Sequence, residues 1–459
     1  MKPFASTKSW MLATAGLVLA ALALLGWFRV GAPPVVEIEA ELPGIGQRTP
    51  IQVRAAEPQR GLSGLTVELV QGGRTERLAE RQHRPRPFWA FWGPRVERDE
   101  LVVEVGAETQ SGLEEGDATI RVIAERAATW IRRPAPVLQE ITLPVRLTPP
   151  TIQVTSSQTY VAQGGSEAVA YTVGATAVRD GVRVGGHFFP GYPLPGGGAG
   201  ARFALFGVPH DLGDAEEIRL TAVDEVGNEL EIPFVDRFTP KPLTTDTIRL
   251  SDRFMARVVP QIVAQTPGLE EADSLLESYL AINRDLRRKN TQTLFELAAQ
   301  SRPEILWRRA FMQLPNTRSM ASFADRRTYM YEGEAVDQQD HLGFDLASVR
   351  QAPVLAANRG VVILAEYFGI YGNTVVLDHG CGLMTLYAHL SSIEVQPQQS
   401  VDRGASLGRT GETGLAGGDH LHFSLLLHGL QVNPLEWWDP KWIENRIARK
   451  LGAALEFEG

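Results

Sequence analysis

The 459-residue sequence contains almost no cysteine and has no excess of positive charge. The single cysteine, Cys381, excludes an internal disulfide framework and a metal site made of several thiolates. Lys and Arg total 45 against 54 Asp and Glu, which gives a net charge of -9. That charge argues against nucleic acid as a partner, because phosphate binding needs a basic face. The hydrophobic fraction of 44% and the charged fraction of 22% are those of an ordinary globular protein.

An uncharged apolar run extends from Trp10 to Phe28 at the N-terminus. As a helix it would be about 28 Å long, close to the thickness of a bilayer's hydrocarbon core. A secretory signal would have a shorter apolar core and a cleavage site, and the nearest candidate, residues 30–32, is followed by two prolines. We therefore predict an uncleaved single-pass anchor within residues 1–32. Lys2 and Lys8 place the N-terminus in the cytoplasm, which puts the rest of the chain on the periplasmic side of the inner (cytoplasmic) membrane.

Residues 33–240 have the pattern of β-structure. Apolar and polar residues alternate, for example over 51–54 and 65–69, as in half-buried antiparallel strands. Residues 120–124 resemble residues 218–222, and each copy is followed by a similar strand that ends at Thr-Pro. A repeat of about 100 residues made of short strands favours two immunoglobulin-like β-sandwich domains, 33–148 and 149–240. The alternative is two unrelated β-domains with similar exit strands.

Residues 241–315 are predicted to form a helical connector. Leu275, Leu276, Tyr279 and Leu280 recur at helical spacing after Pro267-Gly268. A second helical stretch is expected to carry Leu294, Leu297, Ile305, Leu306 and Phe311 and to end at Pro315. The basic run Arg287-Arg288-Lys289 is expected on a solvated helix face. Residues 316–440 return to an antiparallel β pattern with many glycines, and 441–459 are taken as a C-terminal tail, so the whole chain is expected to be mainly β.

Six of the nine histidines lie between His341 and His428. His341 and Asp345 form an H-x-x-x-D pair, and His420-Leu421-His422 is an H-x-H motif. Residues four apart on a straight strand are about 13 Å apart, so the chain is expected to bend at Gly343. Residues two apart project from one face, so one histidine of H-x-H can bind metal while the other moves protons.

A catalytic zinc site has three protein ligands and leaves the fourth position to water or substrate. The motifs therefore predict such a site with an added general base, and His389 is a further candidate proton carrier. His379 and His428 lie near expected turns and are interpreted as structural or exposed.

These motifs resemble the M23 (LytM/lysostaphin-type) metallopeptidases. The similarity includes residues 341–345, the hairpin 371–380, the Y-A-H-L-S segment 387–391, and the G-x-T-G and H-L-H-F segments within 408–423. It covers roughly residues 335–436. The resemblance implies Zn²⁺ held by His341, Asp345 and His422, with His389 and His420 as catalytic residues. The implied reaction is hydrolysis of peptide bonds in the cross-links of peptidoglycan.

The sequence departs from the family pattern at two positions. Asp419 stands where the family has proline, and Ser424 where it has glutamate. Neither is an implied ligand or proton carrier, so activity is still expected. Asn316, just before the domain, could belong to an inhibitory segment that reaches the metal, as in some latent family members.

Three hypotheses follow for function. The first is an anchored zinc endopeptidase acting on peptidoglycan peptides, with other envelope proteins as possible partners. The second is a non-catalytic envelope scaffold that regulates other cell-wall hydrolases, although degenerate members lose ligands and this chain keeps all of them. The third makes the β-domains an adhesion module. For that module the aromatic cluster of Phe88, Trp89, Phe91 and Trp92 is interpreted as core or sandwich edge rather than a glycan platform.

Overall fold

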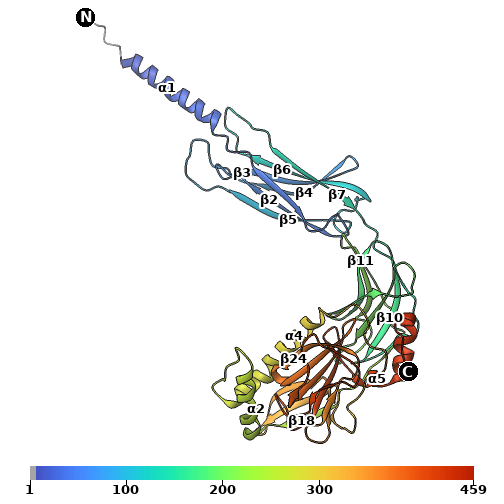
Figure 1. Ribbon diagram of the computed structural model, residues 1–459. Coiled ribbons are helices and arrows are strands. Elements are labelled where there is room, and N and C mark those ends of the chain that lie inside the picture. Colours follow the sequence, from blue (N-terminus) through green and yellow to red (C-terminus); the bar gives the residue numbers. More distant parts are fainter. Residues whose placement is uncertain (1–6, 459) are drawn as a thin grey trace. The chain divides into compact units, whose positions relative to one another are not determined.

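The protein is mainly β, and the computed structural model describes residues 7–458 (Figure 1). Lys2, which contributes to the predicted orientation of the anchor, lies outside this range. The chain forms two compact units. Unit 1 consists of Met1–Pro150 with Val223–Glu229, and unit 2 consists of Thr151–Ala222 with Leu230–Gly459.

Unit 1 begins with helix α1, Thr7–Phe28. Within it, Lys8–Phe28 has a mean hydropathy of 2.1 and is long and apolar enough to cross a membrane. Only 6% of this segment is buried in protein, so it is not the core helix of a soluble domain. The helix is therefore a candidate membrane anchor or signal sequence.

A two-sheet β-sandwich makes up the rest of unit 1. One sheet has the order β1-β2-β5 and the other β4-β3-β6-β7. On β2 alternate side chains are buried, so Ile51 and Val53 face the core, where Val67 of β3 and Ile120 and Val122 of β6 join them. The strands are β1 (Val35–Ala40), β2 (Thr49–Ala56), β3 (Leu62–Gln71), β4 (Arg74–Gln82), β5 (Arg98–Val105), β6 (Gly116–Arg126) and β7 (Val137–Val145).

Unit 2 begins with another pair of sheets, each of four strands, ordered β13-β14-β10-β8 and β12-β11-β15-β16. The repeated segments noted in the sequence occupy equivalent places, since β6 pairs with β7 and β15 with β16. The strands of this region are β8 (Ile152–Val154), β9 (Tyr160–Ala162), β10 (Ser166–Val173), β11 (Ala177–Val184), β12 (His187–Pro190), β13 (Tyr192–Pro193), β14 (Ala201–Gly207), β15 (Ile218–Asp224), β16 (Glu229–Ile232), β17 (Arg237–Thr239) and β18 (Thr245–Arg249).

Three α-helices follow: α2 (Asp252–Gln265), α3 (Leu275–Ala281) and, after one π-helical turn, α4 (Arg287–Ala298). Ser251 and Ser274 cap α2 and α3 by accepting hydrogen bonds from backbone N–H groups. The expectation that the last helix extends to Phe311 is wrong. Helix α4 ends at Ala298, and Pro303 follows where the chain is no longer helical. Phe311 is buried because it packs against Trp307 and Trp437.

The C-terminal region is built on an eight-stranded sheet with the order β19-β22-β30-β26-β25-β24-β28 and β31 paired to β30. Its two faces have different partners because side chains alternate along each strand. Met384, Leu386 and Leu426 pack with helices α2–α4, whereas Leu383 and Tyr387 belong to the core shared with the preceding sheets. The strands are β19 (Arg318–Ala321), β20 (Asp325–Tyr331), β21 (Glu334–His341), β22 (Phe344–Ala347), β23 (Pro353–Leu355), β24 (Gly360–Tyr367), β25 (Asn373–Gly380), β26 (Leu383–Leu390), β27 (Ser392–Ile393), β28 (Ser400–Val401), β29 (Ser406–Arg409), β30 (Leu421–Leu427) and β31 (Leu430–Val432).

The segment expected as a tail is largely helical. It contains short helices α6 (Pro440–Ile443) and α7 (Arg449–Leu451) joined by a π-helical turn (Glu444–Ala448), after α5 (Pro434–Trp438). Ile443, Ile447 and Leu451 of this segment are buried in the core of unit 2. Lys450 forms an ion pair with Glu167 of β10 at 3.0 Å. This contact joins the end of the chain to the second pair of sheets.

Candidate metal centre

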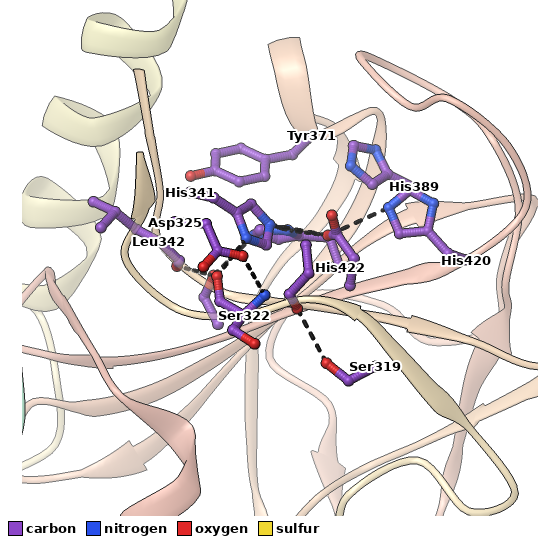
Figure 2. A network of polar contacts seen from close by, with 12 residues as sticks. Ser319, Ser322, Asp325, His341, Leu342, Tyr371, His389, His420 and His422 are labelled. Carbon is purple, nitrogen blue, oxygen red and sulfur yellow. Dashed lines mark hydrogen bonds and ion pairs between the residues drawn. The ribbon is translucent and has the colours of Figure 1, made fainter. Parts of the chain in front are cut away.

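Three side chains from separate parts of the chain meet at one point. His341 Nε2, Asp345 Oδ1 and His422 Nδ1 lie 3.0 Å from one another in all three pairs. Figure 2 shows the rings of His341 and His422 close together, with His389 and His420 beside them. His341 ends β21, Asp345 is on β22, and His422 is on β30. Strand pairing fixes the arrangement, because Asp345 stands directly opposite His422 in the β22–β30 ladder. These are the three residues that the resemblance implied as ligands, and they form a group able to hold a metal ion.

The chain bends between His341 and Asp345, as expected, at Gly343. Close approach is the reason that glycine is needed there. A Cβ on Gly343 would lie 2.6 Å from the Cε1 and Nε2 atoms of His422 and 2.7 Å from Ser424 Oγ. Any side chain at this position would displace the His422 ring.

Hydrogen bonds fix the tautomers of both histidine ligands. His341 Nδ1 donates to the carbonyl oxygen of Ser322 at 2.9 Å, which leaves its Nε2 with a lone pair. Ser424 Oγ donates to Leu342 O at 2.8 Å, so it accepts from His422 Nε2 at 3.0 Å and leaves Nδ1 with a lone pair. Sequence reasoning assigned Ser424 no role, although its position two residues after His422 on one strand puts both side chains on the same face.

The three ligand atoms point at one position, where a cation would fit. Two imidazole nitrogens and a carboxylate oxygen converge within 3.0 Å of one another, so a positive charge between them would satisfy all three. Ligands about 2.0–2.1 Å from a tetrahedral zinc are about 3.3 Å apart. The observed spacing of 3.0 Å is close to that value.

The second oxygen of Asp345 has its own partner. Arg327 Nη2, on β20, donates to Asp345 Oδ2 at 3.0 Å. Burial alone would raise the pKa of Asp345, but the imidazoles of His341, His420 and His422 around the carboxylate hold that pKa well below its usual range. Burial lowers the pKa of His422 to about 4, so that ring is neutral at physiological pH, as a metal ligand must be.

His420 lies beside the ligand triangle. Its Nδ1 donates to Gly418 O at 2.7 Å, and its Nε2 lies 3.4 Å from Asp345 Oδ1. Burial would lower the pKa of His420, but the Asp345 carboxylate raises it above its ordinary value. A dication on Asp345 would act in the opposite direction.

His389 completes the group from an unusual backbone position. Its Nδ1 donates to Thr413 O at 2.8 Å, and its ring centroid lies 4.9 Å from that of His420. In a regular strand His389 would share a face with Tyr387, but its φ of 61° breaks the alternation. Burial, together with the nearby His420 and His422, holds the pKa of His389 well below its ordinary value. A positive φ on a non-glycine residue is typical of functional sites.

A cavity of about 600 Å³ adjoins the ligand triangle. Its lining includes Asp345 and His420, and the connector contributes Phe254, Tyr279 and Arg287. Arg287 also borders the smaller pocket that contains the three ligands. Of the predicted solvated face 287–289, Arg288 and Lys289 are exposed and Arg287 is partly buried at the edge of the cavity.

Three other residues considered from the sequence are not part of the ligand triangle. His379 is fully buried, and its Nδ1 donates to Arg359 O at 2.7 Å, so its structural role is confirmed. Asp419 lines the cavity, yet its two oxygens accept from Thr410 Oγ at 2.6 Å and Gln351 N at 3.1 Å. Asn316 borders a different cavity and does not reach the ligands.

Comparison with known proteins agrees with this geometry. Residues 339–434 match the model of Peptidase family M23, so the chain carries an M23 peptidase domain. All three ligands and both additional histidines lie within the matched residues.

Two of the relatives are bacterial endopeptidases by name, and one of them is named a peptidoglycan DD-endopeptidase. The peptidoglycan DD-endopeptidase ShyA of Vibrio cholerae is 36% identical over 131 residues, which are 28% of this chain and 30% of that protein. The DD-carboxypeptidase/endopeptidase Mpg of Neisseria meningitidis is 41% identical over 95 residues, which are 21% of this chain and 22% of that protein. The chain thus matches less than a third of the length of either relative.

Solved structures include the catalytic domain of lysostaphin from Staphylococcus simulans. The two are 23% identical, and the superposition covers 27% of this chain and 92% of that domain, with a TM-score of 0.24.

Proposed function

We propose that the protein is a zinc-dependent endopeptidase that hydrolyses peptide cross-links of peptidoglycan during cell-wall remodelling. The observation that carries the proposal is the triangle of His341, Asp345 and His422 ligand atoms, each pair 3.0 Å apart. Lone pairs from all three converge, and two further histidines stand beside them. Neutral imidazole and carboxylate ligands in this number are typical of catalytic zinc.

A bound zinc ion would lower the pKa of a coordinated water towards about 7 and polarise the scissile carbonyl. The side chains supply the proton transfers. His389 and His420 both have Nδ1 bound to a backbone carbonyl, so in each ring Nε2 is the nitrogen left for the reaction. One imidazole can accept the proton of the attacking water, and the other can donate to the leaving amine or stabilise the oxyanion.

The cavity suits an extended peptide that carries free carboxylates. It is about 600 Å³ in volume, and its lining includes Arg249, Arg287 and Arg327 as well as Asp246, Asp345 and Asp419. Arg327 is already paired with Asp345, so Arg249 and Arg287 are the cations left for a substrate. Guanidinium groups pair well with carboxylates. The name of the relative ShyA, a peptidoglycan DD-endopeptidase, supports peptidoglycan peptides as the substrate. We infer that a D-Ala to diamino-acid cross-link, rather than a glycine bridge, is the bond cleaved.

The remaining regions would place this domain in the envelope. We propose that residues 1–32 anchor the chain in the inner membrane, with the N-terminus cytoplasmic and the rest periplasmic. Residues 33–148 and 149–240 would be two immunoglobulin-like domains, 241–315 the connector, 316–440 the zinc peptidase domain and 441–459 a C-terminal segment. The two-sheet arrangements around β6–β7 and β15–β16 support the pair of sandwiches.

The alternative is a non-catalytic scaffold that regulates other cell-wall hydrolases. Such a scaffold would not need converging ligands or histidines with a free Nε2. The complete set in this chain therefore favours the enzyme.

The test is digestion of purified sacculi by the full chain in detergent micelles. We expect new muropeptides, loss of activity with a chelator, and recovery when zinc is added back. His422→Ala should lose both metal and activity, whereas His420→Ala should keep metal and lose activity. His83→Ala, a substitution outside the M23 domain, is the matched control and should behave as wild type. Unchanged muropeptides from zinc-loaded protein would reject the proposed activity.

A further inference from the structure

Large apolar side chains are exposed on two loops of unit 1. Trp89 is 58% exposed, Phe91 66%, Trp92 71% and Trp130 65%, and Ile131 follows directly. These exposed fractions contradict a core position for Trp89, Phe91 and Trp92. Apolar surface gathered in this way marks a site of contact with a protein or a membrane.

Both loops are bound to the last turn of α1. Arg29, the first residue after the helix, donates through Nη1 to Phe88 O at 2.8 Å and through Nη2 to Ala90 O at 3.0 Å. Its guanidinium carbon lies 3.9 Å from the centre of the Phe91 ring. These contacts fix the first loop beside the end of the helix.

The second loop lies one turn further into the helix. Thr129 Oγ donates to Gly26 O. A Cβ on Gly26 would lie 2.9 Å from Trp130 Nε1 and 3.0 Å from Ile131 Cδ1. Gly26 is needed there because the second loop packs directly on the helix backbone.

The position of these contacts along α1 sets their depth. Lys8–Phe28 is 21 residues long and spans about 30 Å, so its last turn would stand at the boundary between hydrocarbon and headgroups. Loops that touch Gly26 and Arg29 must lie at the same level. Tryptophan is enriched at that level because its ring is apolar and its N–H is polar.

The charge of the two loops suits the same environment. Residues 84–95 contain three arginines, residues 127–136 contain two, and neither segment has an acidic residue, although the whole chain carries a net charge of -9. Arg132 also lies over the ring of Trp27, with its guanidinium carbon 5.7 Å from the ring centre. Basic groups at the membrane surface are attracted to anionic lipid headgroups.

We infer that residues 88–92 and 130–133 enter the headgroup region of the bilayer that α1 spans. Unit 1 would then be held on the membrane by this lipid-facing surface as well as by the helix. The inference rests on the proposed membrane anchor and is independent of the peptidase activity.

The test measures the depth of spin labels in the full chain, reconstituted in vesicles of phosphatidylethanolamine and phosphatidylglycerol. Labels are attached at Phe91→Cys and Trp130→Cys, with Trp92→Cys as a second position in the first loop. Leu19→Cys in α1 is the lipid reference, and Val102→Cys, 58% exposed on β5, is the aqueous reference. The native Cys381 is fully buried, so it does not compete for the label.

We expect the loop labels to be several-fold less accessible to a water-soluble nickel complex than the label at Val102→Cys, and more accessible to oxygen. If they match Val102→Cys while Leu19→Cys is in lipid, the inference is wrong and the anchor stands. If Leu19→Cys is also in water, both are wrong. Loop labels that are aqueous in pure lipid vesicles but shielded in native membranes would indicate a protein partner and would overturn the lipid contact.

Discussion

Removing one hydroxyl beside the ligand triangle tests how the metal site is held. In Ser424→Ala, His422 Nε2 loses the acceptor 3.0 Å away. Ser424 is fully buried, so solvent does not replace the lost partner. A buried donor left without an acceptor costs about 1–3 kcal/mol.

The loss should fall mainly on the metal-bound state. Metal on Nδ1 forces the proton of His422 onto Nε2, where the substitution leaves it unpaired. Without metal, His422 can move the proton to Nδ1, where Asp345 Oδ1 at 3.0 Å accepts it. A cost of about 1.4–2.7 kcal/mol corresponds to roughly 10- to 100-fold weaker zinc binding.

The assay is competition for zinc against a chromophoric chelator at constant pH. Ser392→Ala is the matched control, because among the described residues Ser392 Oγ is buried and has no hydrogen-bond partner. We expect the Kd for zinc to rise in Ser424→Ala and to stay unchanged in Ser392→Ala. Equal affinities for wild type and Ser424→Ala would refute the role of the Ser424 hydroxyl.

Three other substitutions give separate tests. Gly343→Ala places a Cβ 2.6 Å from the His422 ring and should abolish zinc binding while the circular dichroism spectrum is kept; normal zinc content would contradict this. Arg287→Met should lower kcat/KM on muropeptides by about 10-fold or more, because a charged hydrogen bond contributes about 1.5–3 kcal/mol. Arg288→Met, at an exposed position, is the control and should leave kcat/KM unchanged. Equal losses in both variants would exclude a substrate contact by Arg287. Burial lowers the pKa of His379 to about 4, whereas in the unfolded chain it is about 6.5. Between pH 6.5 and 4 the unfolded state therefore binds more protons than the folded state. The free energy of unfolding falls as the pH drops through this window, by about 2 kcal/mol at pH 5. Urea unfolding of His379→Gln should lose this part of the pH dependence, and a slope equal to wild type would show that His379 does not titrate as stated.

The three residues of the candidate metal centre could be brought together from sequence because short motifs carry them. His341, Asp345 and His422 lie in segments whose spacing sets local geometry, and the resemblance assigned each of them. The residues that hold the ligands could not be found in this way. Arg327 reaches Asp345 only because β20 and β21 pair in one particular register, and no local pattern encodes that register.

The fold shows the same division. Alternating patterns predicted the β-sandwich strands, since half-buried strands bury every second residue. The end of α4 was missed because Phe311 was taken as part of a helix's apolar face. It is buried outside any helix, by its contact with Trp437. The loop at residues 88–92 was misread because an exposed aromatic cluster and a buried one have the same composition. Only the contacts of Arg29 with that loop reveal its position.

The most direct test of the central claim is the zinc content and zinc absorption spectrum of the purified full chain. Convergence of His341, Asp345 and His422 predicts one zinc per chain, with nitrogen and oxygen ligands about 2.0–2.1 Å away. It also predicts that His422→Ala releases this zinc while His420→Ala retains it. A chain that binds no zinc, or that holds it equally well after His422→Ala, would contradict the account.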